Sequence, residues 1–529
     1  MCGIHGIIPR GEVSAEMDDI FFAMHRHQHN RGPDSAGVNL RSKYLLGHQR
    51  LAIIDTSSCG AQPMETDRWV LTYNGEIYNY KSLQDKLASV IDPMRWRSGG
   101  DTETLLFMID QYGVEDTLKA VEGMFAFAAY DKKEDMLWLA TDPMGIKPLY
   151  HYSDARFFAF ASSPGALTHC KDQWELDENA LNDYLALGAT RESLFKGIKK
   201  LMPGSLMRRQ TKNGFTLTHN PPFRGPSFQH TEADVLQVVK DSIKSVTVAD
   251  VPVVMFLSGG IDSSVVASQC PKMDAIHLAG PEQKFAAEVA AKYDNKLITV
   301  DPGEYNAQEC LEDYAMQSGD CSMAAIVPYI VSKEVSKIAK VAISANGTDE
   351  LFFGYDRMSH DLPSDAQFAH IFRQPIIGGT SWDDLEFKTS RHMELNTYVA
   401  FDLNKTLDFA SMCHGLEVRV PYLNTSVVMS AMGLPREKHV RKQYTKAILK
   451  DFLKSEGFSD HFVNRPKLGF SLFSQPKGYE ALQENGVKFL RDKFNIHPRL
   501  ETGRDKRYFA ASAAAFLCWY NVWKNKIAL

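Results

Sequence analysis

Residues 251–270, VPVVMFLSGGIDSSVVASQC, decide the fold of the larger part of the chain. The apolar run VPVVMFL (251–257) predicts a strand buried on both faces, which is typical of a parallel sheet covered by helices. Two adjacent glycines predict a tight turn after it, and SSVVASQC (263–270) predicts a helix. A second apolar run, VAIS (341–344), also ends in a glycine turn. Repeated strand–turn–helix units predict an α/β domain with a parallel sheet.

The chain before residue 211 has a different pattern. Short apolar runs separated by turn residues predict strands, and one helical stretch lies at 102–113. The expected strands are 45–55, 69–78, 125–131, 136–142 and 157–163. This pattern predicts a sheet-rich α+β domain.

The segment TKNGFTLTHNPPFRGPSFQH (211–230) separates these two patterns. It is rich in Pro, Gly, Asn and Thr, which do not continue a helix or a central strand. We therefore expect a first domain at 1–210, a linker at 211–230 and a second domain at 231–529. A chain of 529 residues has room for two to four domains of ordinary size, at roughly 100–200 residues each.

The run LSGGIDSS (257–264) has the features of a phosphate-binding loop. Two glycines free their backbone N–H groups for an anion-binding nest, and serine hydroxyls and a helix N-terminus add donors. A carboxylate such as Asp262 fits beside phosphates if it holds Mg²⁺. The alternative is an ordinary helix start capped by Ser and Asp, which the paired glycines disfavour.

Cys2 directly follows the initiator methionine, so removal of Met1 would leave a cysteine at the N-terminus. A terminal cysteine carries a thiol and an α-amine whose reference pKa is about 8. The amine accepts the thiol proton, so one residue supplies both a nucleophile and its base. Cys2 is therefore a candidate catalytic nucleophile.

NGEIYN (74–79) follows a predicted strand and offers an oxyanion hole. Asn74 has a side-chain amide and Gly75 a backbone N–H, the two donors that such a hole needs. Arg50 and Asp101 carry charges that match the α-carboxylate and α-ammonium of a free amino acid. The alternative is that they are a surface arginine and a helix-capping aspartate.

Seven motifs occur in order within residues 1–205: MCGIHGI, NRGPDSAG, RLAIID, NGEIYN, GDTET, GMFAFAAYD and DPMGIKPLY. The set resembles the N-terminal-nucleophile glutaminase domain of the class II amidotransferases, an α+β sandwich. The resemblance implies that Cys2 is the nucleophile and that Asn74 and Gly75 form the oxyanion hole. It also implies that glutamine is held by Arg50, Asn74, Gly75, Glu76 and Asp101.

The second half resembles the ATP pyrophosphatases, which adenylate a substrate and release pyrophosphate. The resemblance implies that ATP is bound by Leu257, Ser258, Gly259, Gly260, Asp262, Ser263, Ser264, Leu278, Ser344 and Ala345. It implies that Asp262 and Asp349 hold Mg²⁺ and that Lys467, in RPKLGFS, neutralises charge on the α-phosphoryl group. With GLEVRVPYL (415–423), the whole chain resembles the glutamine-hydrolysing asparagine synthetases. The reaction so implied is amidation of a carboxylate through an acyl-adenylate.

Four departures from the family pattern bear on the acceptor and on the glutamine site. Asn346 stands where typical members have an acidic residue, Asn424 where they have Asp, and Asn30 where they have His. SMAAIVP (322–328) replaces a TIRASTP-like segment. Aspartate is the favoured acceptor, and a sugar uronic acid is the alternative. A non-synthesising scaffold and a β-lactam-synthetase-like cyclase are two further alternatives, against which the presence of Cys2 counts.

Composition and charge limit the kinds of partner that the chain is expected to bind. The net charge is −6, from 59 basic and 65 acidic residues, which disfavours a nucleic-acid partner. The longest apolar runs are too short to span a membrane, no secretory signal is apparent, and the eight cysteines form no C-x-x-C pair. We expect a cytoplasmic enzyme that binds glutamine, ATP and an acceptor carboxylate. A homodimer is compatible with the sequence.

Overall fold

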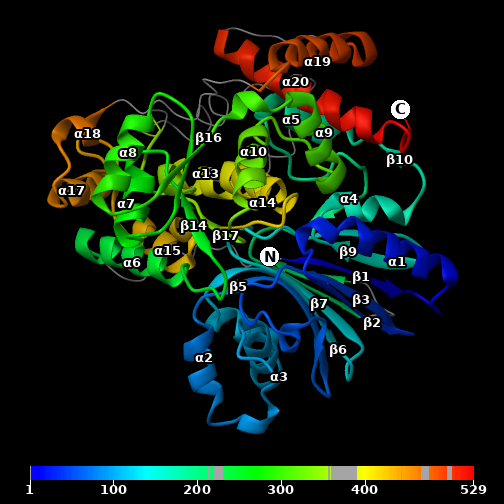
Figure 1. Ribbon diagram of the computed structural model, residues 1–529. Helices are drawn as coiled ribbons and strands as arrows, with labels where there is room; N and C mark the ends of the chain where they lie inside the picture. The colour runs from blue at the N-terminus through cyan, green and yellow to red at the C-terminus, as the bar shows by residue number, and fades with distance from the viewer. Residues whose placement is uncertain are drawn as a thin grey trace.

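The computed structural model describes residues 2–210, 215–219, 230–355, 358, 390–442, 444–465, 476–496 and 503–528. At 215–219, 390 and 503–505 only the backbone is described. Two antiparallel sheets form the N-terminal part, and a parallel sheet with its helices forms the C-terminal part (Figure 1). This division is the predicted one.

The N-terminal part contains two six-stranded antiparallel sheets. The first has the order β11 (Lys199–Lys200), β8 (Tyr150–Ser153), β9 (Phe157–Ala161), β1 (Gly3–Pro9), β3 (Tyr44–Arg50) and β2 (Ser35–Arg41). The second has the order β13 (Phe215–His219), β12 (Ser205–Gln210), β7 (Met136–Thr141), β6 (Gly123–Asp131), β5 (Trp69–Ile77) and β4 (Met64–Glu65). Five of these strands match the five expected from the apolar runs.

The two sheets pack face to face. Side chains from both fill the space between them, among them Ile4 and Phe160 of the first sheet and Val70 and Ala128 of the second. The helices α1 (Ala15–His27) and α4 (Pro164–Leu167) pack on the outer face of the first sheet. The helices α2 (Tyr80–Leu87) and α3 (Asp101–Ala120) cover the outer face of the second sheet. The result is the predicted α+β sandwich, in which β1 carries Cys2 directly before its first residue.

Part of the linker expected at 211–230 is a strand in the structure. Phe215–His219 forms β13, which pairs antiparallel with β12 at the edge of the second sheet, with Met207 opposite Leu217. The sequence FTLTH alternates in the manner of a strand, and β12 supplies its partner, so pairing overrides the turn-rich composition around it. The second domain then begins with α6 (Glu232–Ser245), whose first turn Thr231 caps.

The C-terminal part contains a five-stranded parallel sheet. Its order is β16 (Leu297–Val300), β15 (Ala275–Leu278), β14 (Val253–Phe256), β17 (Val341–Ile343) and β18 (Glu417–Arg419). Figure 1 shows α6, α7 (Ile261–Gln269) and α8 (Gln283–Lys292) to the left of this sheet, and α10 (Ile326–Val335) and α14 (Asn404–Met412) to its right. The region after residue 395 is mostly helical, as expected, but β18 lies within it and adds an edge strand.

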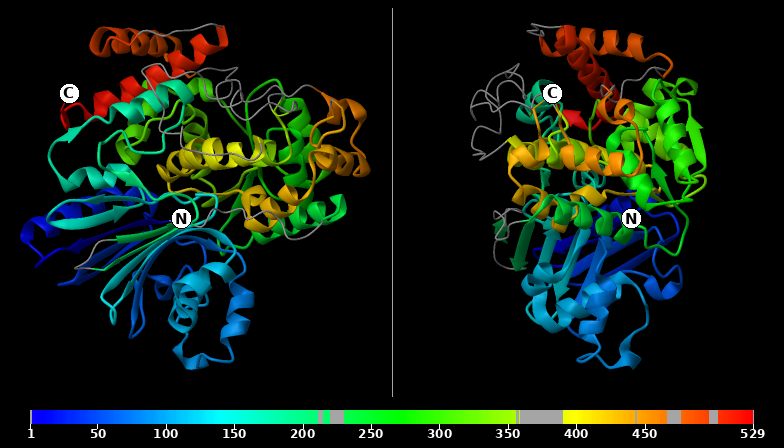
Figure 2. Two further views of the ribbon diagram at one scale, coloured as in Figure 1. Left: turned by 180° about the vertical axis from the view of Figure 1, so that it is seen from behind. Right: turned by 90° about the vertical axis from the view of Figure 1, so that its left-hand side faces the viewer.

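Of the remaining α- and π-helices, α5 (Glu178–Leu187) belongs to the N-terminal part and the others to the C-terminal part. The others are α9 (Ala307–Ser318), α11 (Thr348–Leu351), α13 (Ser390–Glu394), the π-helix Leu395–Leu403, α15 (Thr425–Gly433), α16 (Arg436–His439), α17 (Ala447–Ser455), α18 (Asp460–Asn464), α19 (Tyr479–Phe494) and α20 (Gly503–Trp523). Figure 2 shows α19 and α20 at the end of the molecule opposite α2 and α3. Among the described helices, none is long and apolar enough to span a bilayer.

The C-terminal end returns to the sandwich domain. After α20, β19 (Ile527–Ala528) pairs in parallel with β10 (Trp174–Glu175), and Trp174 N donates to Lys526 O at 2.7 Å. Trp519 and Trp523 of α20 pack against Phe195, with ring centroids 5.1 and 5.2 Å away. The two parts of the chain therefore share a tryptophan-rich contact, which adjoins β8 through Tyr152 and Trp174.

Candidate active site

A small cavity of about 30 Å³ lies where the sandwich meets the parallel-sheet domain. It brings together the predicted residues Cys2, Arg50, Gly75, Glu76 and Asp101. A volume of this size holds about one water molecule.

Asn74 faces Cys2 across this site. The backbone nitrogen of Cys2 donates to Asn74 Oδ1 at 2.8 Å. Since Oδ1 is occupied, Nδ2 points the other way, and this buried amide donor has no hydrogen-bond partner. An unsatisfied buried donor costs free energy unless a ligand or water completes it. Asn74 thus holds the backbone of Cys2 through its oxygen and keeps a buried amide donor without a partner.

Gly75 lies where only glycine fits. It sits in β5 opposite Phe125 of β6. A Cβ at this position would approach Met124 O to 2.1 Å and Phe125 Cα to 2.7 Å. The absence of a side chain lets β5 and β6 approach closely beside the cavity that Cys2 lines.

Arg50 and Asp101 are both buried and held in place. Arg50 Nη1 donates to Ser57 O at 2.7 Å, and Nη2 donates to Asp55 O, so the guanidinium closes the loop that follows β3. Asp101 accepts hydrogen bonds from Tyr73 Oη at 2.8 Å and from Ile77 N at 3.1 Å. Asp101 is the first residue of α3 rather than its cap, which is Gly100. The helix-capping alternative is therefore wrong.

Burial sets the proton affinities in this cavity. It raises the pKa of the Cys2 thiol above its ordinary value, so the thiol is protonated at neutral pH. It also raises the pKa of Asp101, against the lowering effect of the hydrogen bonds from Tyr73 and Ile77. A thiol of this kind needs a base to become a nucleophile.

One residue of the parallel-sheet domain lines the same cavity, and a second contacts a lining residue; the sequence did not single them out for this. Glu417 lines the cavity, and Arg419 Nη2 lies 3.0 Å from Glu76 Oε2. Arg419 Nε lies 2.6 Å from Glu417 Oε1. Although burial raises the pKa of Glu417, neighbouring positive charges, including Arg419 and Lys147, lower it overall. Both residues lie in the motif GLEVRVPYL, but only the tertiary contact shows that they face the sandwich domain.

The phosphate-loop candidate follows β14 as predicted. Gly259 has φ +83°, and a Cβ there would approach Ala286 N to 2.6 Å, so glycine is required. Gly260 caps α7, and its nitrogen donates to Ser258 Oγ at 3.2 Å. The hydroxyls of Ser258 and Ser263 lie 3.1 Å apart. The loop thus combines backbone nitrogens, hydroxyls and a helix N-terminus in one concave segment.

The other predicted nucleotide residues lie at the same edge of the sheet. Leu278 ends β15, and Ser344 and Ala345 follow β17, on the two sides of β14. Because the strands are parallel, their carboxyl ends meet at one edge, where ligands of open α/β sheets bind. The segment Leu257–Ser264 follows β14, between these residues, and is only partly buried.

A lysine that the sequence analysis missed joins the two predicted metal carboxylates. Lys446 Nζ lies 2.5 Å from Asp262 Oδ2 and 2.5 Å from Asp349 Oδ1. Burial lowers the pKa of Lys446, but the two carboxylates outweigh it and raise the pKa overall. Lys446 precedes α17 with φ +54°, in a stretch whose many basic residues resemble a solvated face. Only the short distance between Lys446 and Asp262 in the folded structure distinguishes this lysine from its neighbours.

The carboxylate oxygens of Asp262 and Asp349 suit Mg²⁺ as ligands. Asp262 and Asp349 are close enough to share one ammonium, and both offer oxygen ligands beside the phosphate loop. Within the described part of the chain, no cluster of three or more His, Cys, Asp or Glu side chains could hold a metal ion. Two carboxylates supplemented by phosphate oxygens are a usual Mg²⁺ environment.

Lys467 lies outside the described residues. Arg465, two positions before it, donates through Nη2 to Gly259 O and stacks over the ring of Phe285 at 3.9 Å. This contact places Arg465 against the phosphate loop.

Asn346 forms a local hydrogen bond. Ser344 Oγ donates to Asn346 Oδ1 at 3.0 Å. Nearby, Glu350 is buried and accepts from Tyr355 Oη at 2.6 Å. Burial and the neighbouring Asp349 raise the pKa of Glu350 to about 7. A carboxyl group is therefore present in this segment, although not at position 346.

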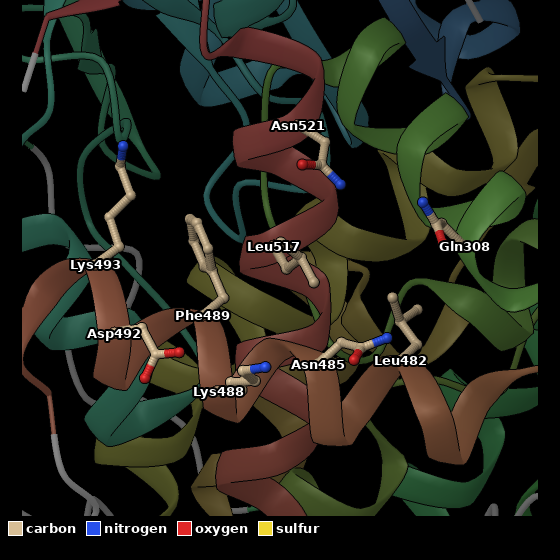
Figure 3. A pocket seen from close by; sticks show the side chains of 9 residues that line it. All are labelled: Gln308, Leu482, Asn485, Lys488, Phe489, Asp492, Lys493, Leu517 and Asn521. Atoms are coloured by element: carbon tan, nitrogen blue, oxygen red, sulfur yellow. The ribbon is translucent and has the colours of Figure 1, made fainter.

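A larger cavity of about 720 Å³ lies between α9, α19 and α20 (Figure 3). Figure 3 shows Gln308, Phe489 and Leu517 directed toward it from these three helices, with Lys488 at its border. It contains none of the residues predicted for glutamine or ATP. Volume alone therefore does not identify the chemical site here.

Comparisons with known proteins identify the family of each domain. Residues 1–219 match the family model described as a glutamine amidotransferase domain, and residues 234–517 match the one described as asparagine synthase. Glutamine-hydrolysing asparagine synthetase 1 of Bacillus subtilis is 28% identical, over 89% of this chain and 87% of its own. The glutamine-hydrolysing asparagine synthetase of Zea mays is 28% identical, over 88% and 76%. That of Triphysaria versicolor is 27% identical, over 94% and 82%. The chain therefore belongs to the asparagine synthase family and is an ATP-dependent amidotransferase ligase with an N-terminal glutamine amidotransferase domain.

Proposed function

We propose that the chain transfers the amide nitrogen of glutamine to a carboxylate, with aspartate as acceptor and asparagine as product, while ATP is converted to AMP and pyrophosphate. The observation that carries the proposal is the geometry at Cys2. Its nitrogen is held by Asn74 Oδ1, and the amide donor of the same side chain is left without a partner. That arrangement suits a terminal nucleophile next to an oxyanion hole.

The first half-reaction uses the small cavity lined by Cys2, Arg50 and Asp101, which we call the glutamine cavity. After removal of Met1, the α-amine of Cys2 takes the thiol proton, and the sulfur attacks the side-chain carbonyl of glutamine. Asn74 Nδ2 and Gly75 N stabilise the tetrahedral oxyanion. The proton passes to the leaving nitrogen as ammonia departs, and water then hydrolyses the thioester to glutamate. Arg50 binds the α-carboxylate of glutamine, and Glu76 and Asp101 bind its α-ammonium.

The second half-reaction uses the phosphate loop. ATP lies on Leu257–Ser264, with Leu278, Ser344 and Ala345 at the nucleoside end. Mg²⁺ bound by Asp262 and Asp349 would offset the negative charge of the triphosphate. An acceptor carboxylate oxygen attacks the α-phosphorus and pyrophosphate leaves. Ammonia then attacks the acyl carbon, and AMP departs with the electron pair of the broken C–O bond.

Lys446 adds a role that the sequence did not assign. Its ammonium lies between the two carboxylates at the edge where phosphates would bind. We propose that it moves onto a phosphoryl oxygen when ATP arrives and stabilises the charge that builds up during adenylation. Lys467 is proposed for the same α-phosphoryl group.

We assign residues 1–219 to the glutaminase domain and residues 231–529 to the synthetase domain. We place the reaction in the cytoplasm.

The acceptor is tested directly by ATP-dependent pyrophosphate release with aspartate or with a hexuronic acid. Asn346 motivates the comparison, because it is bonded to Ser344 where relatives have a carboxylate. Robust release with aspartate, and none with the sugar acid, supports the proposal. Release with the sugar acid alone, unimproved toward aspartate in Asn346→Glu, would overturn aspartate as acceptor.

A further inference from the structure

One strand connects the two candidate sites. The strand β18 pairs in parallel with β17, with Arg419 opposite Ile343. Ser344 N donates to Arg419 O at 2.8 Å. The backbone of Arg419 is therefore bonded to the first residue of the second nucleotide segment.

The side chain of Arg419 points toward the glutamine cavity. Its guanidinium lies 3.0 Å from Glu76 and 2.6 Å from Glu417, and the side chain has no exposed surface. A buried charge of this kind is stable only while its partners stay paired. A shift of the Arg419 backbone would therefore be transmitted to Glu76.

The same guanidinium also holds the segment that supports Arg50. Arg419 Nη1 donates to Val246 O at 2.8 Å and to Val248 O at 2.6 Å. Two residues later, Asp250 N donates to Ile53 O at 3.0 Å, and Asp250 Oδ2 accepts from Asp55 N at 2.8 Å. Asp55 O in turn accepts from Arg50. Arg419 is thus linked by hydrogen bonds to both ends of the glutamine cavity.

We propose that Arg419 is a positioning residue that couples nucleotide binding at Ser344 to glutamine recognition by Glu76 and Arg50. The inference rests on the proposed function. A nucleotide that orders the Ser344 segment also fixes the backbone of Arg419, and with it the geometry of the glutamine cavity. Glutamine then binds more tightly to the nucleotide-bound enzyme, and linkage requires that glutamine favours nucleotide binding equally.

The test compares the KM for glutamine hydrolysis with and without α,β-methylene ATP and Mg²⁺. In the parent we expect the nucleotide analogue to lower KM about fivefold, the lower end of ordinary coupling. Arg419→Lys keeps the positive charge between Glu76 and Glu417 but cannot reproduce the forked hydrogen bonds to both carboxylates and both carbonyls. In this variant we expect KM to be the same with and without the analogue, while ammonia-dependent pyrophosphate release continues.

Lys340→Met is the matched control. Lys340 also pairs across the domains, 2.7 Å from Asp34, but has no bond to Arg419 or Glu76 among its described contacts, and its side chain is 38% exposed. We expect the fivefold effect to persist in it. An Arg419→Lys enzyme that keeps the parental effect would overturn the inference. A parent that releases pyrophosphate but shows no effect of the analogue would also overturn it. A parent that neither hydrolyses glutamine nor releases pyrophosphate would contradict the proposed function itself, and the inference with it.

Discussion

Arg419 Nη2 lies 3.0 Å from Glu76 Oε2, although the two residues are 343 positions apart and belong to different domains. Neither side chain is more than 4% exposed. The glutamine cavity is therefore completed by a strand of the synthetase domain rather than by the sandwich alone. Removing β18 would leave Glu76 as a buried carboxylate without its cation.

Asn74→Asp tests the oxyanion hole. The change keeps the oxygen that accepts from Cys2 N but removes the Nδ2 donor. We expect the glutaminase kcat to fall by about 10²–10³-fold, the usual effect of losing one such donor. Ammonia-dependent amide formation should stay near the parental rate. Parental glutaminase kcat in this variant would show that Asn74 does not stabilise the oxyanion.

Asp262→Asn and Asp349→Asn test the magnesium carboxylates. Each change removes one negative charge from the pair that surrounds Lys446. We expect pyrophosphate release to fall by at least about 100-fold while glutaminase activity persists, because the metal offsets triphosphate charge only in the second site. Restoration of release at higher Mg²⁺ concentration would support weakened metal binding. Release at the parental rate in either variant is incompatible with the assigned role.

Lys446→Met tests the lysine between these carboxylates. We expect pyrophosphate release to fall at least about 100-fold, because a cation that stabilises the phosphoryl charge is lost. Lys450→Met is the control, since Lys450 lies four residues further along and over the ring of Tyr444 at 4.7 Å. The control should keep most of its activity. Equal losses in the two variants would point to a general effect of charge in this region rather than to a specific contact.

The sequence predicts most of the architecture, because its patterns are local. Alternation and apolar runs locate β5, β6 and β14, and the paired glycines locate the phosphate loop. Four motifs scattered over residues 1–104, MCGIHGI, RLAIID, NGEIYN and GDTET, contribute residues to the lining of one cavity. These features depend on short stretches whose chemistry is visible without the fold.

Contacts between distant segments are not visible in this way. Lys446 approaches Asp262 across 184 positions, and nothing in the basic stretch around it distinguishes it from a solvated lysine. The strand β18 has three residues, too few for a period-two pattern to be recognised. The edge strand β13 is hidden by the turn-rich residues around it and needs β12 as a partner. Each of these features arises from tertiary pairing.

Glu350→Gln tests a buried carboxyl group near the proposed acceptor segment. Burial and Asp349 raise its pKa to about 7 from an ordinary 4.5. The folded state therefore binds the proton more tightly than the unfolded state, so this group's stabilising contribution is present below pH 4.5 and is lost as the pH rises toward 7. The shift corresponds to about 3 kcal/mol.

The measurement is the free energy of unfolding at pH 5 and at pH 7.5 for the parent and for Glu350→Gln. We expect the parent to lose about 2 kcal/mol more stability over this interval than the variant, because part of the full shift falls outside it. Identical pH dependence in the two proteins would show that Glu350 is ionised in the folded state at both pH values.

The central claim is that Cys2 serves a glutaminase site separate from a synthetase site. The most direct measurement is pyrophosphate-linked amide formation by Cys2→Ala with glutamine and, separately, with ammonia as nitrogen donor. The account predicts loss of glutamine-dependent product by at least about 10³-fold, as expected for removal of a covalent nucleophile, with ammonia-dependent product near the parental rate. Loss of both activities in a folded variant, or retention of the glutamine-dependent one, would contradict it.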